Sequence, residues 1–262
     1  MSIHVHKAGI NKTTGRTGAS IVTTNLIGNF DPSNIGSDAN AWDNLVGSGN
    51  NLRRYNGITH NNSAPHNFEF DGTNDYLGEA SSGYGGTAFT FNMSNAFTCC
   101  GWFKHNNATH YAFSQKADNS NRWYLQIQSD EDVRLWVEAA GSDTFWTMDE
   151  FRHLIASGTW YYIAVSHDGS GNWKVYLNGG FLFSTSHSTQ DSDAGTTRDP
   201  TGSPALEIGK RNVGSTAYSS SGTKTGHLHI YSAQLSDSQI RQNFLASHDI
   251  YDARIYGPTY TA

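Results

Sequence analysis

The sequence predicts an all-β protein: a two-sheet antiparallel sandwich or jelly roll with one short helix near its C-terminal end. Aromatic residues make up 13% of the 262 residues, and charged residues only 15%, well under the usual quarter. Short alternating segments are separated by turn residues, as is typical of sandwiches. The clearest case is Trp160 to Gly179, where two alternating runs flank Asp168-Gly-Ser-Gly171 and glycine takes positive φ without steric cost.

The strands follow from these alternating segments. We expect one strand at 25–30 and one that begins at Phe68 and turns at Asp71-Gly72. The remaining expected strands are 96–104, 112–115, 123–128, 133–138, 161–167, 173–178, 206–208 and 226–231. A helix is expected over 235–245, because Ser236 and Gln239 form a capping box and Ile240 and Phe244 lie on one face.

The chain reads as one domain. Residues 25–250 contain every expected strand and the helix. Residues 1–24 form a polar N-terminal arm without a sustained period, and 251–262 form a C-terminal tail. The stretch 184–204 is rich in Ser, Thr, Asp and Gly, which indicates a long surface loop.

Several motifs in a fixed order resemble a known family. They are Phe68-Glu-Phe-Asp-Gly-Thr-Asn-Asp-Tyr-Leu77, the 160–179 hairpin that ends in Tyr176-Leu-Asn-Gly179, and Ile230-Tyr231 followed by Leu235-Ser236 and Ile240. This order resembles the laminin-G-like, concanavalin A-like jelly-roll family over about residues 26–247. The resemblance implies a jelly roll with a short helix after its last strand.

The N-terminal half resembles a version of this family common in tailed phages. The matching segments are Leu26-Ile-Gly-Asn-Phe-Asp-Pro-Ser-Asn34, Trp42-Asp-Asn-Leu-Val-Gly-Ser-Gly-Asn-Asn-Leu52 and Phe70-Asp-Gly-Thr-Asn-Asp-Tyr76. Phe30 and Val46 depart from the usual pattern. The resemblance implies a virion component: a capsid-surface, tail or fibre protein.

Side chains on the outward face of the strands are the candidate binding residues. Alternation places Tyr124, Gln126, Arg134 and Trp136 outward, and it places Tyr176 outward on a later strand. Aromatic, amide and guanidinium groups on a solvated face suit stacking on sugar rings or on a partner protein. The alternative is ordinary cross-strand pairing on that face.

Calcium is the candidate metal. Asp71, Asn74 and Asp75 offer oxygen ligands within one tight turn, as hard cations prefer. The alternative is that Asp71 makes an Asx-turn that Asp75 supports. Gly226 stands where many members of the family have an aspartate, which weakens a calcium site carried over from them.

Other chemistry lacks the residues it needs. A glycanase of this fold places two glutamates on one strand through E-x-D-x-E, whereas Asp130-Glu131-Asp132 and Asp149-Glu150 are consecutive. There is no G-x-S-x-G elbow, and Cys99 and Cys100 are adjacent within an expected strand. His4 with His6 and His227 with His229 form pairs, whereas zinc usually needs three or four ligands.

Bulk properties limit the partners. A net charge of −6 disfavours nucleic acid, which requires a basic surface. No run approaches 18 apolar residues, so no membrane insertion is expected. The N-terminus lacks an apolar signal region, which favours synthesis in a host cytoplasm.

Together these observations predict a non-enzymatic structural protein of a phage virion. It would be a capsid decoration or a tail or fibre component, with other virion proteins, copies of itself and a cell-surface glycan as partners. The alternatives are a soluble carbohydrate-binding module and, third, a glycoside hydrolase. The sequence does not distinguish capsid from tail, nor does it identify the copy number, the glycan or the host.

Overall fold

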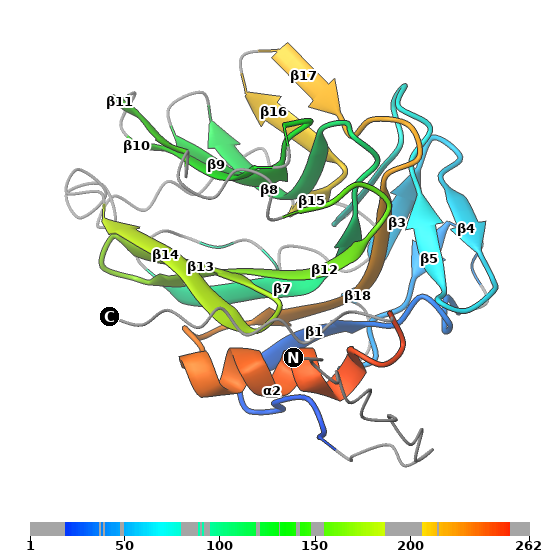
Figure 1. Ribbon diagram of the computed structural model, residues 1–262, viewed down its shortest axis with the longest axis horizontal. Coiled ribbons are helices and arrows are strands. Elements are labelled where there is room, and N and C mark those ends of the chain that lie inside the picture. Colours follow the sequence, from blue (N-terminus) through cyan, green and yellow to red (C-terminus); the bar gives the residue numbers. More distant parts are fainter. Residues whose placement is uncertain are drawn as a thin grey trace, which may run out of the picture.

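The computed structural model describes residues 19–36, 38, 40–47, 50–79, 89, 91, 95–118, 121–130, 132–139, 142–147, 155–186, 206–213 and 215–251. Within these ranges two antiparallel sheets lie face to face, with the helix α2 (Asp237–Ser247) against the outside of one of them (Figure 1). This is the sandwich that the sequence predicts.

The first sheet is the one next to α2. Its order is β14 (Gly180–Ser186), β13 (Asn172–Leu177), β12 (Trp160–Asp168), β7 (Ala96–Lys104), β18 (Lys224–Tyr231), β5 (Asn67–Glu69) and β4 (Thr59–Asn61). Strand β1 (Leu26–Phe30) pairs with β18. The central strands β7 and β12 pair without interruption from Lys104–Trp160 to Ala96–Asp168.

The second sheet covers the other side of the core. Its order is β11 (Ser142–Thr147), β10 (Val133–Ala139), β9 (Asn121–Ile127), β8 (His110–Asp118), β15 (Glu207–Ile208), β6 (Tyr76–Glu79), β3 (Leu52–Tyr55) and β2 (Ala41–Trp42). A separate hairpin of β16 (Lys210–Val213) and β17 (Ser215–Tyr218) lies over the outside of this sheet (Figure 1).

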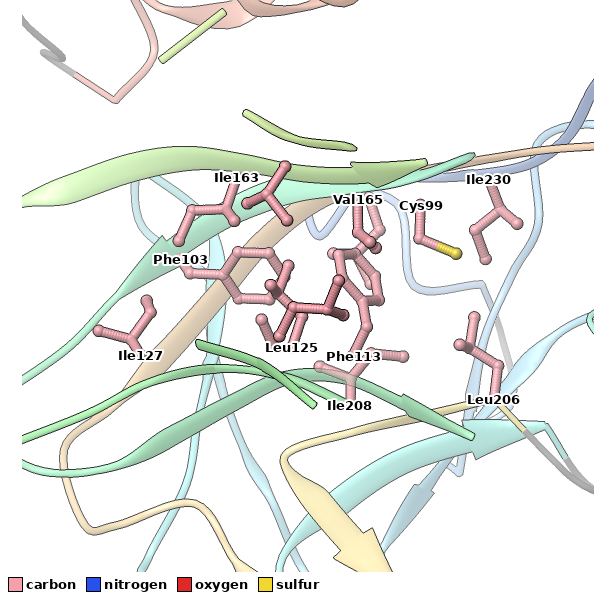
Figure 2. Close-up of a cluster of buried hydrophobic side chains, with 14 of the residues drawn as sticks. Cys99, Phe103, Phe113, Leu125, Ile127, Ile163, Val165, Leu206, Ile208 and Ile230 are labelled. Carbon is pink, nitrogen blue, oxygen red and sulfur yellow. The ribbon is translucent and has the colours of Figure 1, made fainter. Parts of the chain in front are cut away.

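The main core fills the space between the sheets. Because successive side chains of a strand point to opposite faces, each sheet contributes every second residue to it. Figure 2 shows apolar side chains from the two sheets pointing toward one another. The first sheet supplies Cys99, Phe103, Ile163, Val165 and Ile230; the second supplies Phe113, Leu125, Ile127 and Ile208, with Leu206 just before β15.

The expected elements are confirmed, with boundaries shifted by a few residues. The capping box of α2 is present, since the Ser236 hydroxyl accepts from the backbone N–H of Gln239 and the Gln239 side chain accepts from that of Ser236. The sequence did not predict β2, β3, β4, β11, β14, β16 and β17, and it did not separate β5 from β6. Most of these are short, and β3 and β16 contain charged residues in succession.

A second core lies between the first sheet and α2, and both ends of the described chain contribute to it. The Val22 backbone N–H donates to the Asn243 side chain (2.8 Å), and the Tyr231 hydroxyl donates to the Val22 carbonyl (2.9 Å). Tyr251 stacks on Trp102 with ring centres 4.6 Å apart. Val22 and Tyr251, which the sequence assigned to the arm and tail, therefore pack with the domain.

Parts of the predicted arm, loop and tail lie outside the described residues: 1–18, 187–205 and 252–262. In the part of the chain that the structure describes, no helix combines the length and the apolar character needed to cross a bilayer.

Two strand glycines give a matched stability test. A Cβ at Gly101 in β7 would lie against Leu228 Cδ2 and 2.8 Å from the His227 carbonyl oxygen, whereas a Cβ at Gly78 in β6 would have its nearest neighbour 3.5 Å away. We expect Gly101→Ala to lower the free energy of unfolding by about 1–3 kcal/mol through overpacking. Gly78→Ala should cost less. Urea unfolding of both variants measures the difference, and equal losses would contradict the packing at β7.

Candidate binding face of the second sheet

The outer face of the second sheet carries a continuous row of facing residues. Leu125 and Leu135 point into the core, so their neighbours Tyr124 and Trp136 point outward. The strand register places six residues side by side across β10, β9, β8, β15, β6 and β3: Trp136, Tyr124, Ser114, Glu207, Gly78 and Arg53. A shorter neighbouring row contains Arg134, Gln126 and Tyr111.

Four of the predicted binding residues, Tyr124, Gln126, Arg134 and Trp136, meet on this face, but all except the partly exposed Arg134 are buried. Tyr124 is 3% exposed, Gln126 4% and Trp136 5%. Tyr111, Tyr124 and Trp136 form a small buried cluster, against which Ala217 of β17 packs. The expectation of a solvated face was therefore wrong for these side chains, because the β16–β17 hairpin covers them.

Tyr176 lies elsewhere. It belongs to β13 of the first sheet and is fully buried beneath α2, where its hydroxyl donates to Asp237 Oδ1 at 2.8 Å. Burial raises its pKa, and the neighbouring Asp237 carboxylate raises it further. Tyr176 lies on the outer face of its sheet, as the alternation predicts, but the expectation that this face is solvated was wrong, because α2 covers it.

Aromatic rings on the outer face have their own partners within the protein. Tyr124 stacks on Trp136, with ring centres 5.2 Å apart and planes 18° apart. The guanidinium carbon of Arg122 lies over the Trp136 ring at 5.2 Å. Tyr111 meets Tyr124 edge to face at 6.1 Å. Such contacts stabilise the cluster and occupy ring faces that a sugar would otherwise stack on.

The β16–β17 hairpin brings two cations to this face. The guanidinium carbon of Arg211 lies 5.5 Å from the ring centres of both Tyr111 and Tyr124, and Lys210 Nζ lies 4.1 Å from that of Tyr76. Burial raises the pKa of Tyr111 and of Tyr124, and the nearby Arg211 partly opposes that shift. Backbone bonds hold the base of the hairpin, where Gly209 N–H donates to the Tyr111 carbonyl at 2.8 Å.

A second aromatic group, not found from the sequence, lies beside the hairpin. The rings of Tyr55 and Tyr76 stack with centres 4.2 Å apart and planes only 4° apart. Arg53 lies over the Tyr55 ring at 5.1 Å, and Tyr218 of β17 is 6.3 Å from Tyr76. Burial raises the pKa of Tyr76 to about 12, so its hydroxyl stays protonated at neutral pH. The cross-strand register of β3 and β6 brings the two tyrosines together, and neither segment had a distinct strand signal.

Charges on this face differ in how they are paired. Arg134 contacts Asp130 Oδ2 at 3.1 Å and Asp132 Oδ2 at 3.8 Å. Lys210 contacts Glu207 Oε1 at 2.6 Å. Arg211 has no carboxylate partner among the described residues, and its buried Nε–H has no hydrogen-bond acceptor there. We call Arg211 with Tyr111 and Tyr124 the Arg211 cluster.

The predicted calcium ligands lie in a turn in which one carboxylate oxygen of each aspartate accepts backbone hydrogen bonds. Asp71 Oδ1 accepts the backbone N–H of Thr73 at 2.7 Å, and Asp75 Oδ2 accepts that of Asp71 at 3.1 Å. Asp75 Oδ1 is buried without a hydrogen-bond partner among the described residues, and burial raises the pKa of this carboxyl. One such oxygen suits a hard cation, but calcium takes 6–8 oxygen ligands. Calcium at Asp71, Asn74 and Asp75 stays a prediction.

The space at Gly226 also bears on calcium. A Cβ at Gly226 would lie against the Tyr251 hydroxyl and 2.6 Å from Tyr251 Cζ. That hydroxyl accepts the His227 backbone N–H at 2.8 Å. An aspartate at position 226 would therefore have to displace Tyr251, which explains physically why glycine stands there.

The cysteine and histidine candidates are engaged in the fold. Cys99 and Cys100 are fully buried, and burial raises the pKa of Cys100 to about 12 and that of Cys99 as well. His227 Nε2 lies 2.9 Å from Asp31 Oδ1, and His229, in β18 between β1 and β7, is buried. His4 and His6 lie outside the described residues. Among the described residues, no group of three His, Cys, Asp or Glu side chains is arranged to hold a metal.

The comparison with family models matches residues 71–241 to the concanavalin A-like lectin/glucanases superfamily, through its laminin-G model. The chain belongs to this family. No curated protein matches the chain.

Solved structures with a similar fold include receptor-binding domains of botulinum neurotoxins. The domain from the C/D mosaic serotype has a TM-score of 0.61 and 11% identity, covering 85% of this chain and 51% of that one. The neurotoxin DC binding domain in complex with rat synaptotagmin II has a TM-score of 0.58 and 14% identity, covering 84% of this chain and 51% of that one. The neurotoxin DC binding domain in complex with SialylT has a TM-score of 0.57 and 13% identity, with the same coverage of 84% and 51%. This chain spans about half the length of these structures, and at such identities the likeness shows the fold alone.

Two buried histidines predict a loss of stability in mild acid. Burial lowers the pKa of His110 and of His229 from 6.5 to about 3, so both are neutral in the folded protein. Below pH 6.5 the unfolded chain binds protons that the folded chain does not, and stability falls until pH reaches about 3. The loss approaches about 1.4 kcal/mol per pH unit for each histidine.

Urea unfolding between pH 6 and pH 5 measures this loss, in a window above the usual carboxyl range. His229→Asn should reduce the slope of unfolding free energy against pH by roughly half, because it removes one of two such groups. The same slope in the variant, or a stability independent of pH across this window, would show that the histidines are not buried and neutral.

Proposed function

We propose that this chain is a non-enzymatic, lectin-like recognition domain of a phage virion, either a capsid-surface decoration or a tail or fibre component that attaches to the host surface. One observation carries the proposal. Val22 and Tyr251, near the two ends of the described chain, pack on the α2 side, whereas the β16–β17 hairpin and the Arg211 cluster lie on the far side of the main core (Figure 1). A domain held by its ends would present the hairpin side outward.

The family supports recognition as the role of that outward side. Members share a lectin or glucanase fold. Among the structural neighbours one is a receptor-binding domain, and others are complexes with rat synaptotagmin II and with SialylT. On the outer face of the second sheet, the hairpin holds cationic groups over buried aromatic rings, and such cations suit a polar ligand or a protein surface.

The virion context is supported by the first two segments of the domain. Leu26–Asn34 and Trp42–Leu52 carry the pattern that resembles tailed-phage proteins, and β1 and β2 place both segments in the sandwich. In this role the partners are other virion proteins and copies of this chain, which assemble after synthesis in the host cytoplasm, together with a cell-surface glycan.

The engagement of reactive groups supports a non-enzymatic role. Asp130 and Asp132 both contact Arg134, and Cys99 and Cys100 are buried thiols with raised pKa values. Asp149 and Glu150 lie outside the described residues. A glycoside hydrolase would have to hold two carboxyl groups on either side of one glycosidic bond.

Cysteine labelling of purified particles tests the orientation. Thr216→Cys places an exposed thiol on β17, and Ser238→Cys is the matched control on α2. Cys99 and Cys100 are buried and give a low background. We expect mass spectrometry to detect the protein in particles, maleimide to label Thr216→Cys on them, and Ser238→Cys to react only in the free protein.

Absence of the protein from particles would contradict the virion role and favour the soluble carbohydrate-binding module. Equal labelling at both positions on particles would contradict attachment through the α2 side. Release of reducing sugar from host-surface polysaccharide by the purified chain would contradict the non-enzymatic role and favour a glycoside hydrolase.

A further inference from the structure

We infer that the Arg211 cluster binds the carboxylate of an acidic sugar, so that Arg211 is the anion-recognition residue of the proposed domain. The inference rests on the proposed recognition function and goes further by naming the ligand class and the residue that selects it. It is carried by the position of Arg211, by its lack of a carboxylate partner among the described residues, and by the polar groups around it.

The fold holds the Arg211 guanidinium in a defined place. Arg211 and Ala217 are direct partners across the β16–β17 hairpin, and Ala217 packs on the cluster of Tyr111, Tyr124 and Trp136. The guanidinium is equally distant, at 5.5 Å, from two tyrosine ring centres. Ser114 donates its hydroxyl to the carbonyl of Lys210, the residue before Arg211, and so fixes the start of β16. A cation held in this way loses little conformational freedom on binding a ligand.

Three other cations in the described structure differ from Arg211 in having carboxylate partners. Lys210 pairs with Glu207 at 2.6 Å, Arg134 with Asp130 at 3.1 Å and Lys224 with Glu69 at 2.7 Å. Arg211 has two aromatic rings and no carboxylate among the described residues, and its buried Nε–H has no acceptor there. A half-buried charge is costly unless it is paired, so an incoming anion would complete this arrangement.

The chemistry of the group selects a carboxylate. The planar guanidinium presents parallel N–H donors that match the two oxygens of a carboxylate. The hydroxyl groups of Tyr111 and Tyr124 lie beside it. Such groups can exchange hydrogen bonds with sugar hydroxyls.

Local charge favours a ligand with one carboxylate over a polyanion. Carboxylates already pair with Lys210 and Arg134 on both sides of Arg211, and the whole chain carries a net charge of −6. A sulfated polysaccharide or a nucleic acid needs a row of available cations to displace its counterions. One guanidinium without a carboxylate partner among the described residues is suited to a sugar with a single carboxylate.

Calorimetric titration of the full chain tests the inference. The probes are 3′-sialyllactose, which has one carboxylate, lactose as its neutral counterpart, and a heparin octasaccharide as the polyanion. We expect 3′-sialyllactose to bind and lactose to bind much more weakly. Arg211→Gln should lower the affinity for 3′-sialyllactose by about tenfold or more, as expected for loss of a charge-assisted pair.

Two variants control for charge and for folding. Arg241→Gln removes the same charge from an exposed position on α2 and should bind as the unmodified chain does. Arg211→Lys keeps the charge over the tyrosines but lacks the planar fork, so it should fold normally and bind 3′-sialyllactose more weakly. Thermal unfolding of each variant separates a loss of binding from a loss of structure.

The inference is overturned if 3′-sialyllactose does not bind, if lactose binds equally well, if only heparin binds, or if Arg241→Gln weakens binding as much as Arg211→Gln. None of these outcomes would contradict the virion role. That role is tested separately, by whether particles contain the protein and whether maleimide labels Thr216→Cys on them. Conversely, specific sugar binding by a protein absent from particles would support the Arg211 site and reject the virion role.

Discussion

Alternation of side chains along each strand is the constraint on which this structure depends. Every second side chain of a strand points into the main core, and the side chains between them point outward. In this chain the outward half is also rich in large aromatic side chains, so each sheet needs a cover on its outer face. The helix α2 covers Trp102, Tyr162 and Tyr176 on the first sheet. The β16–β17 hairpin covers Tyr111 and Tyr124 on the second.

The helix α2 and the β16–β17 hairpin differ in the chemistry of the side chains with which they cover their sheets. The two sides of the molecule therefore have different properties. The cover of the first sheet is mainly apolar, with Ile240 and Phe244 from α2 and Tyr251 from the chain that follows it. Its polar contacts, such as the bonds of Asn243 to Val22 and Tyr231, lie inside the protein. The cover of the second sheet places Lys210 and Arg211 over aromatic rings instead. One side therefore holds Val22 and Tyr251, and the other presents charge.

Sequence reasoning succeeded where a local signal determines the structure. The β7 and β12 segments have long runs of strand-forming residues, and the Ser236–Gln239 capping box fixes the start of α2. The alternation also assigned Tyr124, Gln126, Arg134 and Trp136 to one face correctly. It could not show what covers a face, because a cover comes from residues distant in sequence: Asp237 lies 61 residues from Tyr176, and Arg211 is likewise far along the chain from Tyr124.

The Arg211 cluster shows why part of the site could not be found from sequence. The segment Gly209-Lys-Arg-Asn-Val213 has no alternation, so nothing local indicates that it folds over an aromatic cluster. Its role depends on the register of β8 and β9 beneath it and on which carboxylates lie within reach. Pairing of charges is a property of the folded chain, and composition alone gives only the net charge of −6.

Photo-crosslinking during attachment to host cells tests the central claim most directly: one side of the sandwich is held and the other recognises. A photoreactive amino acid would replace Thr216 on the hairpin or Ser238 on α2 in otherwise intact particles. The proposed function predicts that the residue at 216 crosslinks to the host surface and the residue at 238 to other virion proteins. The reverse pattern, or crosslinks to virion proteins from both positions, would contradict it.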